Sequence, residues 1–130
     1  MSRSTTAAAV LTAAVLMLAG CGGGELVRTD RPQLKLTLDE YRIVPQNVEV
    51  QAGRMKFVVR NTGRLTHNLV IQVPEGPDGN PVNVAKVDTM QPGQTAPPIK
   101  VALSPGEYRL VCTIANHDDL GQFGTLKVAG

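Results

Sequence analysis

One cysteine and two histidines are the residues of this sequence best suited to bind a transition metal. The chain of 130 residues holds only two histidines and two cysteines. Cys112 ends an alternating segment, and four residues separate it from His117, so one short loop could bring a thiolate and an imidazole to the same ion. His67 begins another apolar segment that could lie beside the first. Two imidazoles and a soft thiolate suit copper, and they could also bind zinc.

Composition excludes several classes of function. The length suits one compact domain and excludes large barrels and two-domain dehydrogenases. The formal net charge is +2 and the basic residues are scattered along the chain, so we expect no nucleic-acid partner. If His67 and His117 bind one ion, no histidine remains for a second, catalytic copper. We therefore expect a protein that is not an enzyme.

The N-terminal segment predicts export and anchoring. Arg3 precedes an apolar run over 7–19, which is shorter than the roughly twenty residues needed to span a bilayer. The run ends in Leu18-Ala19-Gly20-Cys21, which resembles the lipobox of bacterial lipoproteins. We expect residues 1–20 to be a signal peptide, Cys21 to be lipidated, residues 21–32 to be a flexible tether, and residues 33–130 to be the domain. This predicts an extracytoplasmic protein held at a bacterial membrane; the alternative is an ordinary cleaved signal with a coincidental cysteine.

The rest of the chain has the pattern of short β-strands. Apolar and polar residues alternate with a period of two, which is the pattern of a half-buried strand, and turn residues separate the runs. The expected strands cover 34–38, 48–50, 55–59, 69–73, 99–103, 108–112 and 123–128. The segment 82–90 fits either a short helix or an irregular strand. Seven or eight such strands predict an all-β fold, an antiparallel β-sandwich of Greek-key type.

Four motifs in this pattern resemble those of the cupredoxins, the blue-copper family, over roughly residues 34–128. They are the pair His67-Asn68, the approach Pro105-Gly106-Glu107-Tyr108-Arg109-Leu110-Val111-Cys112, the loop from Cys112 to His117, and the terminal Gly124-Thr125-Leu126-Lys127-Val128. The resemblance implies one type 1 copper ion held by His67, Cys112 and His117. It also implies that Asn68 and Thr113 hydrogen-bond to each other and tie the two ligand segments together.

The resemblance leaves the axial ligand open, because no methionine follows His117. Gln122 lies five residues after His117, a spacing similar to that of phytocyanins, whose axial ligand is Met or Gln. Gln122 is therefore the expected axial ligand, and its amide oxygen should lower the reduction potential relative to a methionine. The carbonyl of Thr66 is a further axial candidate, as in azurins. Met55, in an alternating strand, is better explained as core, and Met90 is also a poor candidate.

Three functions remain open on the sequence alone. The first is a monomeric one-electron carrier that meets a redox partner protein. The second is a protein that delivers copper to a membrane protein, and the third is a metal-free accessory module. Asp118 and Asp119 stand where many cupredoxins present an apolar docking patch, so we expect a basic or polar partner surface.

Overall fold

The computed structural model describes residues 24–130, all of them in strands and the loops that join them. The predicted signal peptide and Cys21 lie outside the described residues. The strands are β1 (Leu26–Thr29), β2 (Gln33–Asp39), β3 (Arg42–Val44), β4 (Asn47–Gln51), β5 (Gly53–Asn61), β6 (His67–Val73), β7 (Val82–Met90), β8 (Ile99–Leu103), β9 (Gly106–Val111) and β10 (Phe123–Ala129). Within this part of the chain, no helix has the length and apolar character to cross a membrane.

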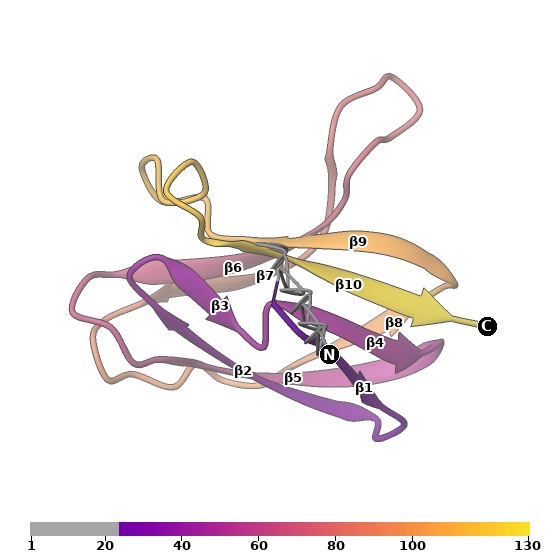
Figure 1. Ribbon diagram of the computed structural model, residues 1–130, viewed down its shortest axis with the longest axis horizontal. Helices are drawn as coiled ribbons and strands as arrows, with labels where there is room; N and C mark the ends of the chain where they lie inside the picture. Colours follow the sequence, from indigo (N-terminus) through magenta and orange to yellow (C-terminus); the bar gives the residue numbers. More distant parts are fainter. Residues whose placement is uncertain (1–23) are drawn as a thin grey trace, which may run out of the picture.

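The strands form two sheets packed face to face (Figure 1). One has the order β1-β4-β10-β9-β6-β7 and the other β3-β2-β5-β8. The predicted all-β sandwich is confirmed. The predicted antiparallel pairing needs one correction: both sheets are mixed, because β2 runs parallel to β5 and β4 runs parallel to both β1 and β10. The chain passes from β3 to β4 in the opposite sheet and back to β5, and such crossings permit parallel neighbours.

The core confirms the alternating pattern. Strand β2 turns Leu34, Leu36 and Leu38 into the core. They share it with Phe57 and Val59 of the parallel strand β5, and all five side chains are buried. Strand β7 resolves the ambiguous segment 82–90. It is an edge strand whose fully buried side chains are those of Val87 and Met90, so its sequence lacks a clean period. The loop between β6 and β7 projects from the sandwich (Figure 1).

Strand β1 corrects the predicted tether. Leu26–Thr29 lies within the segment 21–32, yet it pairs in parallel with β4. The side chain of Asn47 also donates a hydrogen bond to the carbonyl of Gly24 at 2.7 Å. The side chains of β1 are largely exposed, so the strand leaves no alternating signal in the sequence.

Candidate metal centre

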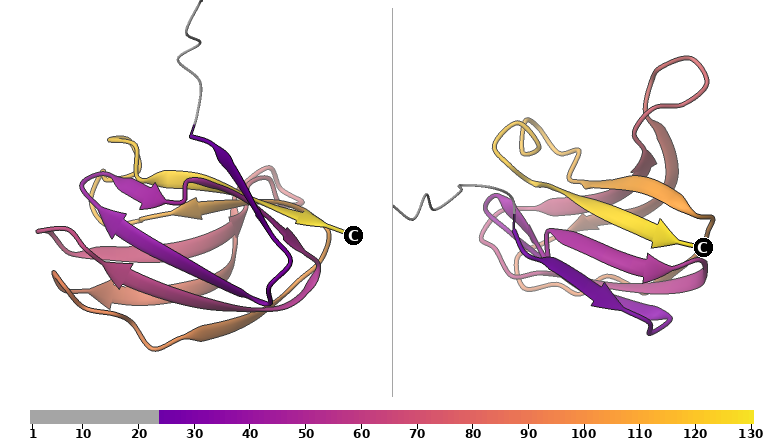
Figure 2. Two further views of the ribbon diagram at one scale, coloured as in Figure 1. Left: turned by 60° about the horizontal axis from the view of Figure 1, so that its bottom comes forward. Right: turned by 45° about the vertical axis from the view of Figure 1, so that its right-hand side comes forward.

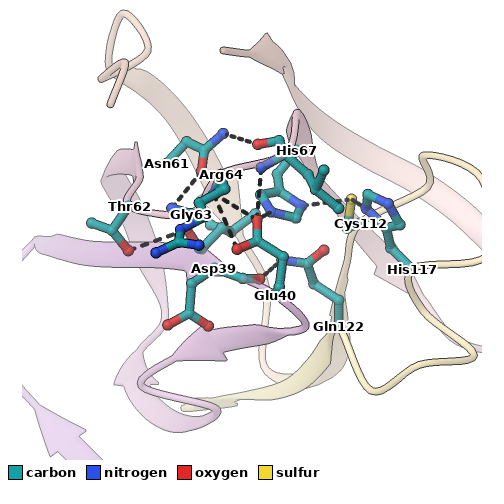
Figure 3. A network of polar contacts seen from close by, with 12 residues as sticks. Asp39, Glu40, Asn61, Thr62, Gly63, Arg64, His67, Cys112, His117 and Gln122 are labelled. Atoms are coloured by element: carbon teal, nitrogen blue, oxygen red, sulfur yellow. Dashed lines mark hydrogen bonds and ion pairs between the residues drawn. The ribbon is translucent and has the colours of Figure 1, made fainter. Parts of the chain in front are cut away.

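Three candidate ligands meet at one end of the sandwich. The Nδ1 atom of His67 lies 4.0 Å from the Sγ atom of Cys112, and the Nδ1 atom of His117 lies 3.6 Å from the same sulfur. One ligand atom from each residue lies within 4.8 Å of the other two (Figure 3). His67 and Cys112 are fully buried and His117 is 8% exposed. The sequence prediction that these residues share one site agrees with this geometry, and so small a separation suits a single ion.

Strand pairing places these residues. Strand β6 pairs with β9 in antiparallel register, with Val70 opposite Val111. The start of β6 and the end of β9 therefore reach the same end of the sheet, which brings His67 to Cys112. The loop after Cys112 is closed by its own backbone. The backbone amide of Cys112 donates a hydrogen bond to the backbone carbonyl of Gln122 at 3.1 Å. The backbone amide of Gln122 in turn donates to the backbone carbonyl of His117 at 3.0 Å.

Asn68 and Thr113 join the two ligand segments. The side-chain amide of Asn68 donates to the hydroxyl of Thr113 at 2.9 Å, and the backbone amide of Thr113 donates to the side-chain oxygen of Asn68 at 2.8 Å. These are the hydrogen bonds that the resemblance implies. Asn68 is 5% exposed and Thr113 lies at the surface, so both hydrogen bonds are partly buried. The pair fixes the spacing of His67 and Cys112 independently of any ion.

Replacing Asn68 with alanine is expected to destabilise the fold by about 1–3 kcal/mol, because the amide of Thr113 loses its buried acceptor. Thermal or urea unfolding of the metal-free protein measures this change. Asn83→Ala is the control, since its side chain in β7 accepts an exposed hydrogen bond from Gln72 in β6. Equal stability of the two variants would contradict the bracing role of Asn68.

Gln122 carries an unpaired buried oxygen. Its side chain is fully buried, and its Nε2 atom donates to the carbonyls of Asp39 at 2.6 Å and Arg42 at 3.2 Å. Both partners are acceptors, so the amide nitrogen must face them and the Oε1 atom must point away. Figure 3 shows that oxygen on the side of Cys112 and His117. In the described part of the chain, it is the one buried side-chain polar atom without a hydrogen-bond partner.

Glu40 binds the outer nitrogen of His67, and the sequence reasoning missed it. Its Oε1 atom lies 2.9 Å from His67 Nε2 (Figure 3). The same oxygen accepts hydrogen bonds from the backbone amides of Arg64 at 2.9 Å and Leu65 at 2.8 Å. Those amides, followed by the hydrogen bond to His67, lower the pKa of Glu40 to about 2. A side chain at Gly63 would collide with this carboxylate, so glycine permits the close approach.

The Glu40 contact determines the tautomer of His67. An ionised carboxylate only accepts hydrogen bonds, so Nε2 of His67 must carry the proton. In the neutral ring, Nδ1 then holds a free lone pair, and this is the atom that faces Cys112. A carboxylate on the outer nitrogen of a histidine is a common device for orienting a metal ligand and increasing its basicity. The contact with Glu40 therefore leaves Nδ1 of His67 free to bind a metal ion.

A family model described as a cupredoxin-like domain matches residues 7–123. The chain belongs to the cupredoxin-like family. The resemblance stated from the motifs is thus confirmed. No curated protein matches the sequence.

Solved structures of cupredoxins have the same fold. Reduced auracyanin from Roseiflexus castenholzii superposes with a TM-score of 0.67 at 21% identity, covering 78% of this chain and all of that one. Auracyanin A, described as a blue copper protein from Chloroflexus aurantiacus, gives a TM-score of 0.61 at 16% identity over 75% of this chain and 98% of its own. Rusticyanin from Thiobacillus ferrooxidans superposes with a TM-score of 0.62 at 17% identity, covering 85% of this chain and 86% of that one.

The alternative axial candidates and the two loop carboxylates of this cupredoxin lie in different surroundings. Thr66 is half-buried directly before β6, and the side chain of Met55 lies in the core. Met90 is also in the core and stands opposite His67 in the β6–β7 register. Asp118 lies 3.9 Å from Arg109, so one of the two loop carboxylates is already paired, while Asp119 is exposed.

Tyr41 packs on the most exposed candidate ligand of the cupredoxin. Its ring lies 5.0 Å from that of His117 at an interplanar angle of 58°. Tyr41 follows Glu40 in the turn between β2 and β3, so one turn contacts both histidines. This turn supplies both contacts.

Proposed function

We propose that this cupredoxin binds one copper ion in a type 1 site and carries single electrons. His67, Cys112 and His117 would hold the ion, and Gln122 would supply the further ligand expected at the axial position. The observation that carries the proposal is the convergence of two imidazole nitrogens and one thiol sulfur, all buried, within 4.8 Å. The orphaned Oε1 atom of Gln122 supports the axial assignment, because a buried oxygen without a partner is costly unless something binds it.

Bound copper would supply a one-electron couple between Cu(I) and Cu(II). The chain's part is to hold the ligands in one arrangement for both oxidation states. The hydrogen bonds of Asn68 and Thr113, the closed backbone of the loop 112–122 and the contact of Glu40 with His67 all do so. Burial and fixed ligands favour electron transfer over copper delivery, which requires the ion to leave. Both histidines of the chain belong to this set, which supports a carrier rather than an enzyme.

We place the protein outside the cytoplasm, anchored through a lipid on Cys21 and active as a monomer. A redox partner would approach at His117, the candidate ligand with the greatest exposure. Asp119 and the partly paired Asp118 beside it favour a basic or polar partner surface.

Copper titration tests the site. We expect one equivalent of Cu(II) to give strong visible absorption from thiolate-to-copper charge transfer, and Cys112→Ala to abolish it. The matched control is Cys21→Ala, which removes the other cysteine and should leave the absorption intact. A paramagnetic resonance spectrum of ordinary tetragonal Cu(II), or tight binding of zinc with no coloured copper form, would refute the type 1 assignment. Fast electron self-exchange with slow copper release distinguishes a carrier from a delivery protein.

A further inference from the structure

The outer face of the four-stranded sheet is strongly cationic. Its outward side chains come from alternate positions of β2, β3, β5 and β8, strands that lie side by side in Figure 2 (left). We call it the basic face, and its unpaired cations are Lys35, Arg54, Lys56, Arg60 and Lys100. The only carboxylate among the outward positions of these strands is Asp39, which already pairs with Arg42 at 2.6 Å.

The opposite sheet has a different charge arrangement. There Glu49 pairs with Arg28 at 3.3 Å and with Lys127 at 3.6 Å, and Asp118 pairs with Arg109. Among residues 24–130, no ion pair within 4 Å involves a cation of the basic face other than Arg42. The whole chain carries only +2, so the positive charge is concentrated on one side.

Strand register makes this concentration costly. Lys56 of β5 stands directly opposite Lys100 of β8. Like charges directly opposite each other in a sheet are destabilising. A partner that brings negative charge to this face would relieve the repulsion, so the charge pattern fits an anionic surface as broad and flat as the sheet itself.

The N-terminal end of the described chain lies at the edge of the basic face. Gly24 lines one shallow hollow together with Arg42 and Val44, the outward residues of edge strand β3. Val44 is 46% exposed and Val27, in the same hollow, is 40% exposed. Because β1 is folded onto β4, only three peptide units join Cys21 to Gly24, and these span at most about 11 Å. A lipid on Cys21 would therefore hold this edge against the bilayer.

We propose that the basic face binds the anionic phospholipid headgroups of the membrane that carries the protein. The lipid anchor of the proposed function orients the face, and copper has no part in the contact. The loop 112–122, which carries His117, joins β9 and β10 of the opposite sheet and belongs to none of the strands of the basic face. Headgroups would also repel the exposed Asp119 on that loop.

Vesicle sedimentation of the mature chain, beginning at residue 21 with Cys21→Ser, tests the face without the lipid. This chain contains every strand of both sheets. We expect it to bind phosphatidylglycerol–phosphatidylcholine vesicles, not pure phosphatidylcholine, and to be released by high salt. One Lys near an anionic membrane strengthens binding about fivefold, so Lys56→Gln with Lys100→Gln should weaken it about 25-fold. The matched control, Lys86→Gln with Lys127→Gln, removes the same charge elsewhere and should weaken it less than about threefold.

Folding does not confound this comparison, because removing the Lys56–Lys100 repulsion should leave the melting temperature unchanged or higher. Equal weakening by both double variants, or no binding to the anionic vesicles, overturns the proposal. Binding of poly-glutamate through the basic face, with no binding to vesicles, would assign the face to an acidic protein instead. The copper-free chain suffices, so a failed copper titration and a failed vesicle assay remain distinguishable.

Discussion

Replacing Gln122 with methionine is expected to raise the reduction potential of bound copper by about 60 mV or more, which corresponds to a tenfold change in the relative affinity for the two oxidation states. The amide oxygen of Gln122 is a harder ligand than a thioether, so it favours Cu(II). The structure presents that oxygen buried and without a partner, while the amide nitrogen is held by two backbone carbonyls. Substitution changes the ligand atom with little change in side-chain volume.

Gln122→Leu separates an axial role from a structural one. Both variants lose the hydrogen bonds to the carbonyls of Asp39 and Arg42, so each should be destabilised by about 1–3 kcal/mol. Only the methionine variant retains an axial donor, so electrochemistry should give the lowest potential for Gln122, a higher one for methionine and the highest for leucine. Equal potentials in all three proteins, with stability alone reduced, would leave Gln122 as a purely structural residue.

The candidate ligands were predictable because their residue types are scarce. With two histidines and one cysteine in the domain, spacing and strand period were enough to select His67, Cys112 and His117. The core strands were predictable for a related reason, since each buries one face of a period-two pattern. Strand β1 escaped prediction because its side chains are exposed and its contribution is backbone pairing with β4.

Glu40 escaped prediction because its role depends on register between distant strands. It lies 27 positions before His67, and no local motif relates the two. The parallel pairing of β2 with β5 places Leu38 opposite Asn61, which brings the turn after β2 against the loop 62–66. Asn61 is fully buried, and its side-chain amide donates hydrogen bonds to the backbone carbonyls of Leu65 and Met90. These hydrogen bonds fix the loop 62–66. Sequence spacing alone cannot show such a contact, since it requires knowing which strands are parallel neighbours.

Replacing Glu40 with glutamine is expected to raise the reduction potential as well, by about 60 mV, a tenfold change in relative affinity. The carboxylate is ionised at neutral pH and bonds to the outer nitrogen of His67, so its negative charge favours the more positive Cu(II) state. Glutamine keeps an oxygen that can accept hydrogen bonds from the backbone amides of Arg64 and Leu65. The change therefore removes charge and leaves the loop braced.

Two further variants isolate the charge effect. Asp39→Asn removes the neighbouring carboxylate, which faces Arg42 rather than His67, and should shift the potential much less. Glu40→Ala removes both the charge and the acceptor, so it should add a loss of about 1–3 kcal/mol in stability. Nitrogen-15 NMR of the metal-free protein provides an independent measurement, because the Glu40 contact requires the proton of His67 on Nε2. If Glu40→Gln leaves the potential unchanged, and Glu40→Ala lowers stability but leaves the tautomer of His67 unchanged, Glu40 braces the loop and does not act on the metal ligand.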